Sequence, residues 1–314
     1  MIGNADLVIL LSPEKETNVA INLSNPPGKQ FVFSGQYATI NNEWCQPELI
    51  TKIPPVYSDG DLLDSIVGIS ANEFKKRCIN QYKRYVTHNS AQLQFSEDTR
   101  TLANLSCAFD CLENLQATHY CLQTAYQKKE NITREQAFAA FLDVYLPDDF
   151  HNYLKDFPVN HPLALYCYNY RNVVMDLYDT HKDPLAYEKN LLKNAPLTKE
   201  EQTLIHQYET AFKAGISFQQ ESELMALSAK YFKENDQFRW ESFSKAKERL
   251  SNIIQDSTSL IVDYIRAIYM RSSFYNLQPL TPRQELMASE ITNPIFLGII
   301  QDMNRQMQPR QKTI

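Results

Sequence analysis

The chain has 314 residues, a formal net charge of −6 and only seven glycines. Phosphate-cradling loops and dinucleotide-binding turns need clustered glycine, and the sequence has none, so a nucleotide-cofactor fold is not expected. The negative charge gives no electrostatic reason to expect a nucleic-acid partner, and no apolar run is long enough for a membrane span.

The number and spacing of the cysteines indicate the redox state of the compartment in which the protein functions. Six cysteines are scattered along the chain without a C-x-x-C pair, which is typical of a reducing compartment. The apolar run at residues 7–11 is too short for the core of a signal peptide. We therefore expect a soluble, cytoplasmic protein. The glycine-poor composition, rich in Asn, Gln, Tyr and Lys, also suits a bacterial effector that enters host cells without a cleaved signal peptide.

The first 60 residues are expected to form a small β and loop element. Short β-favouring runs alternate with turn residues up to residue 40, and prolines at 47, 54 and 55 then favour a loop over residues 41–60. This pattern predicts two or three short strands, with a hairpin as one arrangement. The candidate strands are residues 7–11, 19–23 and 31–33.

From Asp61 onward the pattern is helical. We therefore expect a mainly α fold, an irregular multi-helix bundle with a small N-terminal β element. Residues 61–180 would form a helical core unit, and residues 198–307 a second helical unit that can be continuous with the first. The predicted helices are residues 61–67, 71–86, 101–127, 133–145, 163–179, 184–194, 198–214, 217–233, 237–254, 256–274, 282–290 and 293–306.

Three helix starts carry a capping box, a Thr followed three residues later by Gln or Glu. In this motif the hydroxyl and the longer side chain each bind the other residue's backbone N–H, so that two otherwise unpaired donors are satisfied. The pairs are Thr133 with Gln136, Thr198 with Glu201, and Thr281 with Gln284.

The stretch 101–127 is predicted to be one buried helix, because its apolar residues recur at helical spacing around most of the circumference. Its polar residues form a narrow stripe that we expect to face water. The stripe consists of Ser106, Asp110, Glu113 and Thr124.

Three cysteines, Cys107, Cys111 and Cys121, share one face of this helix. At about 1.5 Å rise per residue, Cys111 and Cys121 stand about 15 Å apart along the axis. One ion cannot bridge them, because zinc–sulfur bonds are about 2.3 Å long. We therefore expect core thiols here and no metal site.

Two other sequence patterns contain a cysteine that could carry chemistry. Cys78 and Arg84 fit C-x5-R, but the segment is helical in character and lacks the glycine of a phosphate-binding loop. Cys45, His161 and Asp176 (or Asp179) are the candidates for a cysteine-hydrolase arrangement of nucleophile, base and orienting acid. Residues 160–162 read equally well as a turn that leads into a helix.

Residues 59–115 resemble the last helices of the vacuolar-protein-sorting-nine type of Rab guanine-nucleotide exchange domain. The matching features are the run Asp61-Leu62-Leu63-Asp64-Ser65-Ile66, the acidic turn Ser96-Glu97-Asp98, and the helical runs at 103–108 and 112–115. The resemblance implies that Asp61 inserts beside the phosphate-binding lysine of a GTPase and competes with magnesium and phosphate for it. It further implies that Leu62, Leu63 and Ile66 lie near an apolar groove, with Thr101 approaching Asp61.

The function that we expect is protein–protein recognition by helical surfaces, without a cofactor. Its most specific form is nucleotide exchange on a Rab-type small GTPase. A cysteine-nucleophile hydrolase built on Cys45 and His161 is the alternative, and a scaffold without catalysis is the third.

Overall fold

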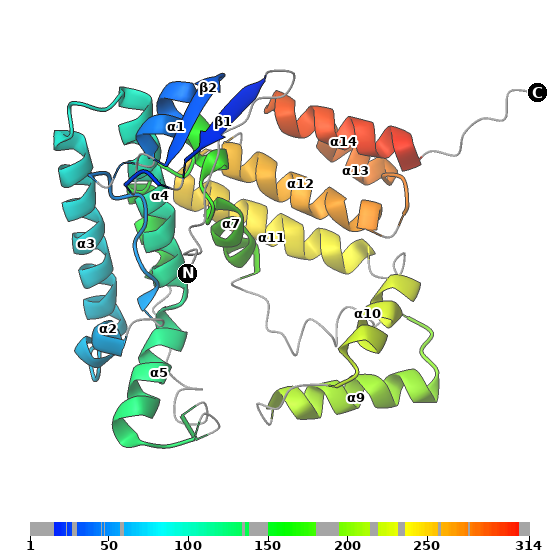
Figure 1. The fold of residues 1–314 in the computed structure, drawn as a ribbon. Coiled ribbons are helices and arrows are strands. Elements are labelled where there is room, and N and C mark those ends of the chain that lie inside the picture. Colours follow the sequence, from blue (N-terminus) through cyan, green and yellow to red (C-terminus); the bar gives the residue numbers. More distant parts are fainter. Residues whose placement is uncertain are drawn as a thin grey trace, which may run out of the picture. The chain divides into compact units, whose positions relative to one another are not determined.

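The structure is a computed structural model (Figure 1). In the part of the chain that the structure describes, it is mainly α with one small antiparallel sheet near the N-terminus, which confirms the expected fold class. Over the described residues, no helix combines the length and apolar character needed to cross a membrane. The structure describes all residues except 1–15, 23, 27–29, 45, 47, 57–59, 134–135, 138–149, 180–194, 214–218, 232–235, 257–258, 276 and 308–314.

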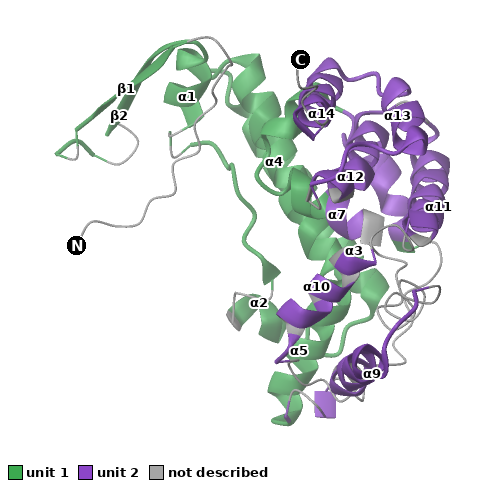
Figure 2. Cartoon of the chain, turned by 90° about the vertical axis from the view of Figure 1, so that its right-hand side faces the viewer, with its two compact units in different colours: residues 1–132, 144–150, 161–173 green, residues 133–143, 151–160, 174–314 purple. Residues whose placement is uncertain are grey.

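The chain divides into two compact units, which are described separately (Figure 2). The N-terminal hairpin belongs to the same unit as the first helices, and the division passes through α7 (Tyr170–Asp179). The boundary expected between residues 180 and 198 lies largely outside the described residues. Unit 1 comprises residues 1–132, 144–150 and 161–173, and unit 2 comprises residues 133–143, 151–160 and 174–314.

Unit 1 begins with the hairpin of β1 (Thr17–Ile21) and β2 (Phe31–Gly35), which are antiparallel. These strands confirm two of the three candidates, and the third, residues 7–11, lies outside the described residues. Gly35 ends β2 with φ +92°, and a Cβ there would lie 2.3 Å from the Glu16 carbonyl oxygen. Only glycine fits this close approach without a shift of the backbone.

The short helix α1 (Ala38–Trp44) follows the hairpin, so the loop predicted from residue 41 is wrong over its first residues. The side-chain hydrogen bonds of Asn42 to β2 account for this helix. Its Oδ1 accepts the Phe33 N–H at 2.8 Å, and its Nδ2 donates to the Phe33 carbonyl at 3.0 Å. This contact with β2 outweighs the weak helix propensity of the local sequence.

The main body of unit 1 is helical. Its helices are α2 (Gly60–Ser65), α3 (Ala71–Ala91), α4 (Glu97–Gln116) and α5 (Thr118–Glu130), and α3 and α4 pack side by side (Figure 1). Ser70 caps α3 by accepting the Glu73 N–H at 3.2 Å, and Ser96 caps α4 by accepting the Thr99 N–H at 3.4 Å. Side-chain oxygens at this position satisfy one of the unpaired N–H groups of a helix start.

The prediction of one continuous helix over residues 101–127 is wrong. α4 begins earlier, at Glu97, and ends at Gln116, and α5 begins at Thr118. Between them Ala117 has ψ 7°, and the Thr118 hydroxyl donates to the Leu115 carbonyl at 2.5 Å. A threonine hydroxyl bound to a nearby carbonyl competes with the helical pattern, which accounts for a break without Gly or Pro.

The segment after α5 is also more broken than predicted. The helix expected over residues 163–179 is a 3-10 turn, η3 (Pro162–Tyr166), followed by α7, and another 3-10 turn, η2 (Phe150–Asp156), precedes both. Within unit 1, the rings of Phe109 and Tyr170 meet edge to face at a centroid distance of 5.0 Å. This contact joins the start of α7 to the buried face of α4.

Unit 2 is built around α12 (Leu260–Tyr275), which packs against α11 (Asp236–Ile254), α13 (Pro282–Ser289) and α14 (Pro294–Met307) (Figure 1). A helix buried by three neighbours must be apolar on most faces, and Ile261, Val262, Ile265 and Met270 are fully buried. A smaller pair, α9 (Lys199–Lys213) and α10 (Glu221–Lys230), buries Ile205 and Leu227. Of the predicted helix 133–145 only Gln136 and Ala137 are described as helical, and residues 184–194 lie outside the described residues.

All three predicted capping boxes are confirmed. The hydroxyls of Thr133, Thr198 and Thr281 each accept the N–H three residues on at 3.3 Å. In return, the Thr133, Thr198 and Thr281 N–H groups donate to the partner side chains at 2.9, 2.7 and 3.0 Å.

Candidate functional site

Asp61 lies in the first turn of α2 with its side chain exposed, and the neighbouring Leu62 is half-buried. Leu63 and Ile66 are buried, with exposed fractions of 7% and 4%. They therefore belong to the core of unit 1. Of the three apolar residues that the resemblance places near a groove, Leu62 is the one that keeps part of its surface for a partner.

Two contacts hold α2 in place. The Arg77 Nη1 donates to the Ser65 carbonyl at 2.8 Å, and the Lys128 Nζ lies 2.7 Å from Asp64 Oδ1. The ion pair is solvent-exposed and contributes little stability by itself. Together the two contacts fix the helix that carries Asp61 against the first half of α3 and the end of α5.

Thr101 lies at the other end of the same helices. It is half-buried in the second turn of α4, and the neighbouring Arg100 donates from Nη1 to the Ser90 carbonyl at 3.2 Å. At about 1.5 Å per residue, Ser90 is about 20 Å along α3 from Arg77, which holds α2. The structure therefore does not bring Thr101 and Asp61 together.

His161 is a helix cap. It occupies the N-cap of η3, and its Nδ1 accepts the Leu163 N–H at 3.2 Å. The neutral ring then carries its proton on Nε2. A general base in a cysteine hydrolase needs one nitrogen free to accept the thiol proton while the other N–H binds the orienting acid, which this arrangement does not provide.

The other two members of that arrangement add no support. Asp176 is exposed on α7, and Cys45 lies outside the described residues. Residues 160–162 form the turn into a helix that the alternative reading expected. Of the three candidates, the described contacts of His161 therefore speak against the hydrolase.

The five cysteines of unit 1 that the structure describes are packing residues. Cys107, Cys111 and Cys121 are at most 1% exposed, and burial raises the pKa of the Cys78, Cys107 and Cys167 thiols to about 12. Such thiols are protonated at neutral pH and are poor nucleophiles. Among the described residues no group of His, Cys, Asp and Glu has the geometry of a metal site.

The polar stripe faces water less than predicted, because Asp110 is buried and Ser106, Glu113 and Thr124 are half-buried. On α4, Asp110 and Ser106 bind the backbone of residues 50–56, a segment that lies outside the helices and strands of unit 1. Asp110 Oδ2 accepts the Ile53 N–H at 2.6 Å, and the Ser106 hydroxyl donates to the Thr51 carbonyl at 2.7 Å. Asn114, one position from the stripe, accepts the Val56 N–H at 2.9 Å and donates to the Pro54 carbonyl at 3.3 Å.

The segment is also bound by α3. Asn89 is fully buried, and its amide pairs with both backbone groups of Ile50 at 2.9 Å. Side-chain amides here replace the second strand that an extended backbone would otherwise need. Sequence reasoning missed this role, although polar residues at helical spacing on an apolar helix were its signal.

Asp110 is a buried carboxyl group of unit 1 whose pKa is perturbed. Burial raises its pKa to about 6, against the lowering effect of the bonds from Ile53 and Asn169. Its Oδ1 accepts Asn169 Nδ2 at 2.8 Å, and the same Nδ2 donates to Glu113 Oε2 at 2.7 Å. Both oxygens of Asp110 are therefore occupied by the fold, which makes it a structural and pH-sensitive group.

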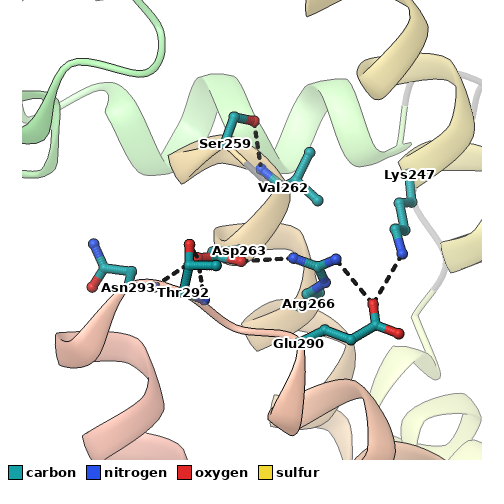
Figure 3. Close-up of polar contacts among 8 residues, drawn as sticks. All are labelled: Lys247, Ser259, Val262, Asp263, Arg266, Glu290, Thr292 and Asn293. Carbon is teal, nitrogen blue, oxygen red and sulfur yellow. Dashed lines mark hydrogen bonds and ion pairs between the residues drawn. The ribbon is translucent and has the colours of Figure 1, made fainter. Parts of the chain in front are cut away.

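Unit 2 contains a buried charge cluster around α12 (Figure 3). Asp263 is fully buried, and its Oδ1 accepts from Arg266 Nη1 at 2.7 Å. Its Oδ2 accepts the N–H groups of Thr292 and Asn293 at 2.9 and 2.8 Å. Arg266 reaches on to Glu290 at 3.0 Å. The cluster fixes the connection between α13 and α14 onto α12.

Comparison with protein-family models, with curated proteins and with solved structures found no match.

Proposed function

We propose that the chain acts by binding another protein through a helical surface, and that its specific activity is nucleotide exchange on a Rab-type small GTPase. The observation that carries this proposal is the exposed carboxylate of Asp61 on α2, a helix anchored by Arg77 and Lys128. A carboxylate held in this way can approach the phosphate-binding lysine of a GTPase and compete with magnesium and phosphate.

The surface proposed here is smaller than the one that the resemblance implies. Asp61 and the half-buried Leu62 lie on it, whereas Leu63 and Ile66 support it from the core. Thr101 is not part of it, because that residue belongs to the opposite end of α3 and α4. The exchange reaction displaces a bound ion and nucleotide, so it requires no cofactor.

The composition supports one further element of the proposal. A glycine-poor chain rich in Asn, Gln, Tyr and Lys suits a bacterial effector, and Rab-type GTPases would be its targets in the cytoplasm of a host cell. Direct delivery into that cytoplasm would agree with the free cysteines of unit 1.

The test is nucleotide release from a panel of Rab GTPases loaded with a fluorescent nucleotide. Asp61→Ala should slow the accelerated release by at least about tenfold, because a charged contact made at the nucleotide site is lost. Asp98→Ala is the matched control, since it removes an exposed carboxylate from the first turn of α4 in the same unit and leaves Asp61 and both anchors of α2 in place.

Three results would count against the proposal. They are release at the intrinsic rate for every GTPase, release that Asp61→Ala leaves unchanged, and equal losses in the two variants. A GTPase that binds without accelerated release would instead identify a non-catalytic scaffold.

A further inference from the structure

The outer edge of β1 is an open strand edge. Two backbone hydrogen bonds between the strands, at the two ends of the hairpin, show which residues of β1 bond to β2. They run from the Gln36 N–H to the Glu16 carbonyl and from the Asn22 N–H to the Gln30 carbonyl. In an antiparallel pair, residues that bond to the partner strand alternate with residues whose backbone groups point away. Thr17, Val19 and Ile21 therefore direct their N–H and C=O groups away from β2.

The other edge of the hairpin is covered at its centre. On β2 the outward backbone groups of Phe33 are both taken by the Asn42 amide of α1. The part of the chain that the structure describes provides no such cover for the outward groups of Val19 and Ile21. The hairpin therefore has one edge that α1 blocks at Phe33 and one edge to which a further strand can be added. Figure 2 shows the hairpin extending away from the helices of unit 1.

The composition of β1 does not protect this edge. Natural edge strands carry charged residues, prolines or bulges that prevent pairing with another chain, whereas β1 reads Thr-Asn-Val-Ala-Ile. Val19 and Ile21 are 40% and 59% exposed, and they share one face of the hairpin. A sheet of only two strands is marginal by itself, so an added strand would stabilise it.

We infer that the occupant of this edge is β1 of a second copy of the chain, paired antiparallel about a two-fold axis at Val19. In this register Val19 pairs with Val19 of the partner subunit, and Thr17 pairs with Ile21 of the partner subunit. All outward backbone groups of β1 find partners, and a continuous sheet of four strands results. Such a contact is isologous and closes at two subunits.

The charges next to β1 favour this antiparallel register. Glu16, which directly precedes the strand, stands opposite Asn22 of the partner subunit, so no two acids face each other. A parallel arrangement would instead bring the two copies of Glu16 side by side, which is unfavourable in a chain that is already negatively charged. The strand is thus complementary to itself in one orientation only.

Disulfide cross-linking tests the register. In Val19→Cys the two introduced cysteines would have Cα atoms about 5.5 Å apart across the axis, within the range of a disulfide. Mild oxidation should give a covalent dimer. Asn18→Cys is the control, because its two cysteines would be displaced along the strands to about 8 Å, beyond disulfide range. No cross-link in Val19→Cys, or equal cross-linking in both variants, would overturn the inference.

Light scattering of the full chain tests the interface without a cross-link. The wild type should have twice the monomer mass, and Val19→Lys, which places two like charges at the axis, should be monomeric. Val32→Lys is the matched control: Val32 is 58% exposed on β2, away from the open edge, and this variant should remain dimeric. A monomeric wild type, or a dimer that survives Val19→Lys, contradicts the inference, and so does a Val32→Lys variant that is equally monomeric.

Discussion

The amide of Asn89 should be the main attachment of residues 50–56 to α3. Asn89 is fully buried and pairs with the Ile50 N–H and carbonyl at 2.9 Å each. The Cys107 thiol also donates to the Ile50 carbonyl, at 3.0 Å. Asn89→Ala would therefore leave the Ile50 N–H without an acceptor, while the carbonyl would keep a weak donor.

The expected loss of stability follows from these two bonds. A buried N–H left unpaired costs about 1–3 kcal/mol, and loss of the second bond costs about 1 kcal/mol. Asn89→Ala should therefore lower the free energy of unfolding of unit 1 by about 2–4 kcal/mol. Asn89→Asp keeps the shape but turns a carboxylate oxygen toward the Ile50 carbonyl, so it should be at least as destabilising.

Hydrogen exchange read by mass spectrometry is the appropriate assay, because it reports the segment itself. Peptides that cover residues 48–56 should lose protection in Asn89→Ala, and urea unfolding gives the total free energy. Asn104→Ala is the control: Asn104 is only half-buried on α4 with a single 3.5 Å contact to Ser90, so a change of about 0.5 kcal/mol is expected. Unchanged protection in Asn89→Ala would refute this account of how the segment is held.

Two further predictions concern buried charges. The pKa of Asp110 is raised from 3.8 to about 6, so its protonated form stabilises the fold fully below about pH 4, and this contribution is lost as the pH rises through 6. The shift corresponds to about 3 kcal/mol. Urea unfolding between pH 4 and 7 should show the free energy of unfolding declining in the wild type but not in Asp110→Asn. The same dependence on pH in both proteins would contradict this role of Asp110. In unit 2, Asp263→Ala should lower the free energy of unfolding by about 3–5 kcal/mol, because it removes the innermost partner of the buried Arg266. Glu290→Gln, at a side chain that is 42% exposed, should cost about 1 kcal/mol, and equal losses in these two variants would exclude a special role for Asp263.

The parts of the fold that could be predicted from the sequence depend on local chemistry. Helical periodicity gave the fold class, and the three capping boxes marked helix starts because each needs only residues three positions apart. The two strands were likewise visible as β-favouring runs beside turn residues. Each of these patterns depends only on residues that are close in sequence, so it can be recognised without knowledge of tertiary contacts.

The errors arose where distant residues decide the structure. The break after Gln116 has no Gly or Pro to mark it, and α1 depends on the contact of Asn42 with β2. The polar stripe of α4 was assigned to water because its partner, the backbone of residues 50–56, is more than 50 positions away. At the candidate site the position of Asp61 on a helix was predictable, whereas the burial of Leu63 and Ile66 depends on packing.

The way in which residues 50–56 are held has a consequence for the order of folding. α3 and α4 are neighbours in sequence and can pair through local contacts, which form quickly, whereas the bonds to the segment close loops of 39 to 60 residues. We therefore expect the helical pair to form first and to present its amides and carboxylate as a template onto which the segment docks. Mutations at the segment should then accelerate unfolding and leave the folding rate nearly unchanged.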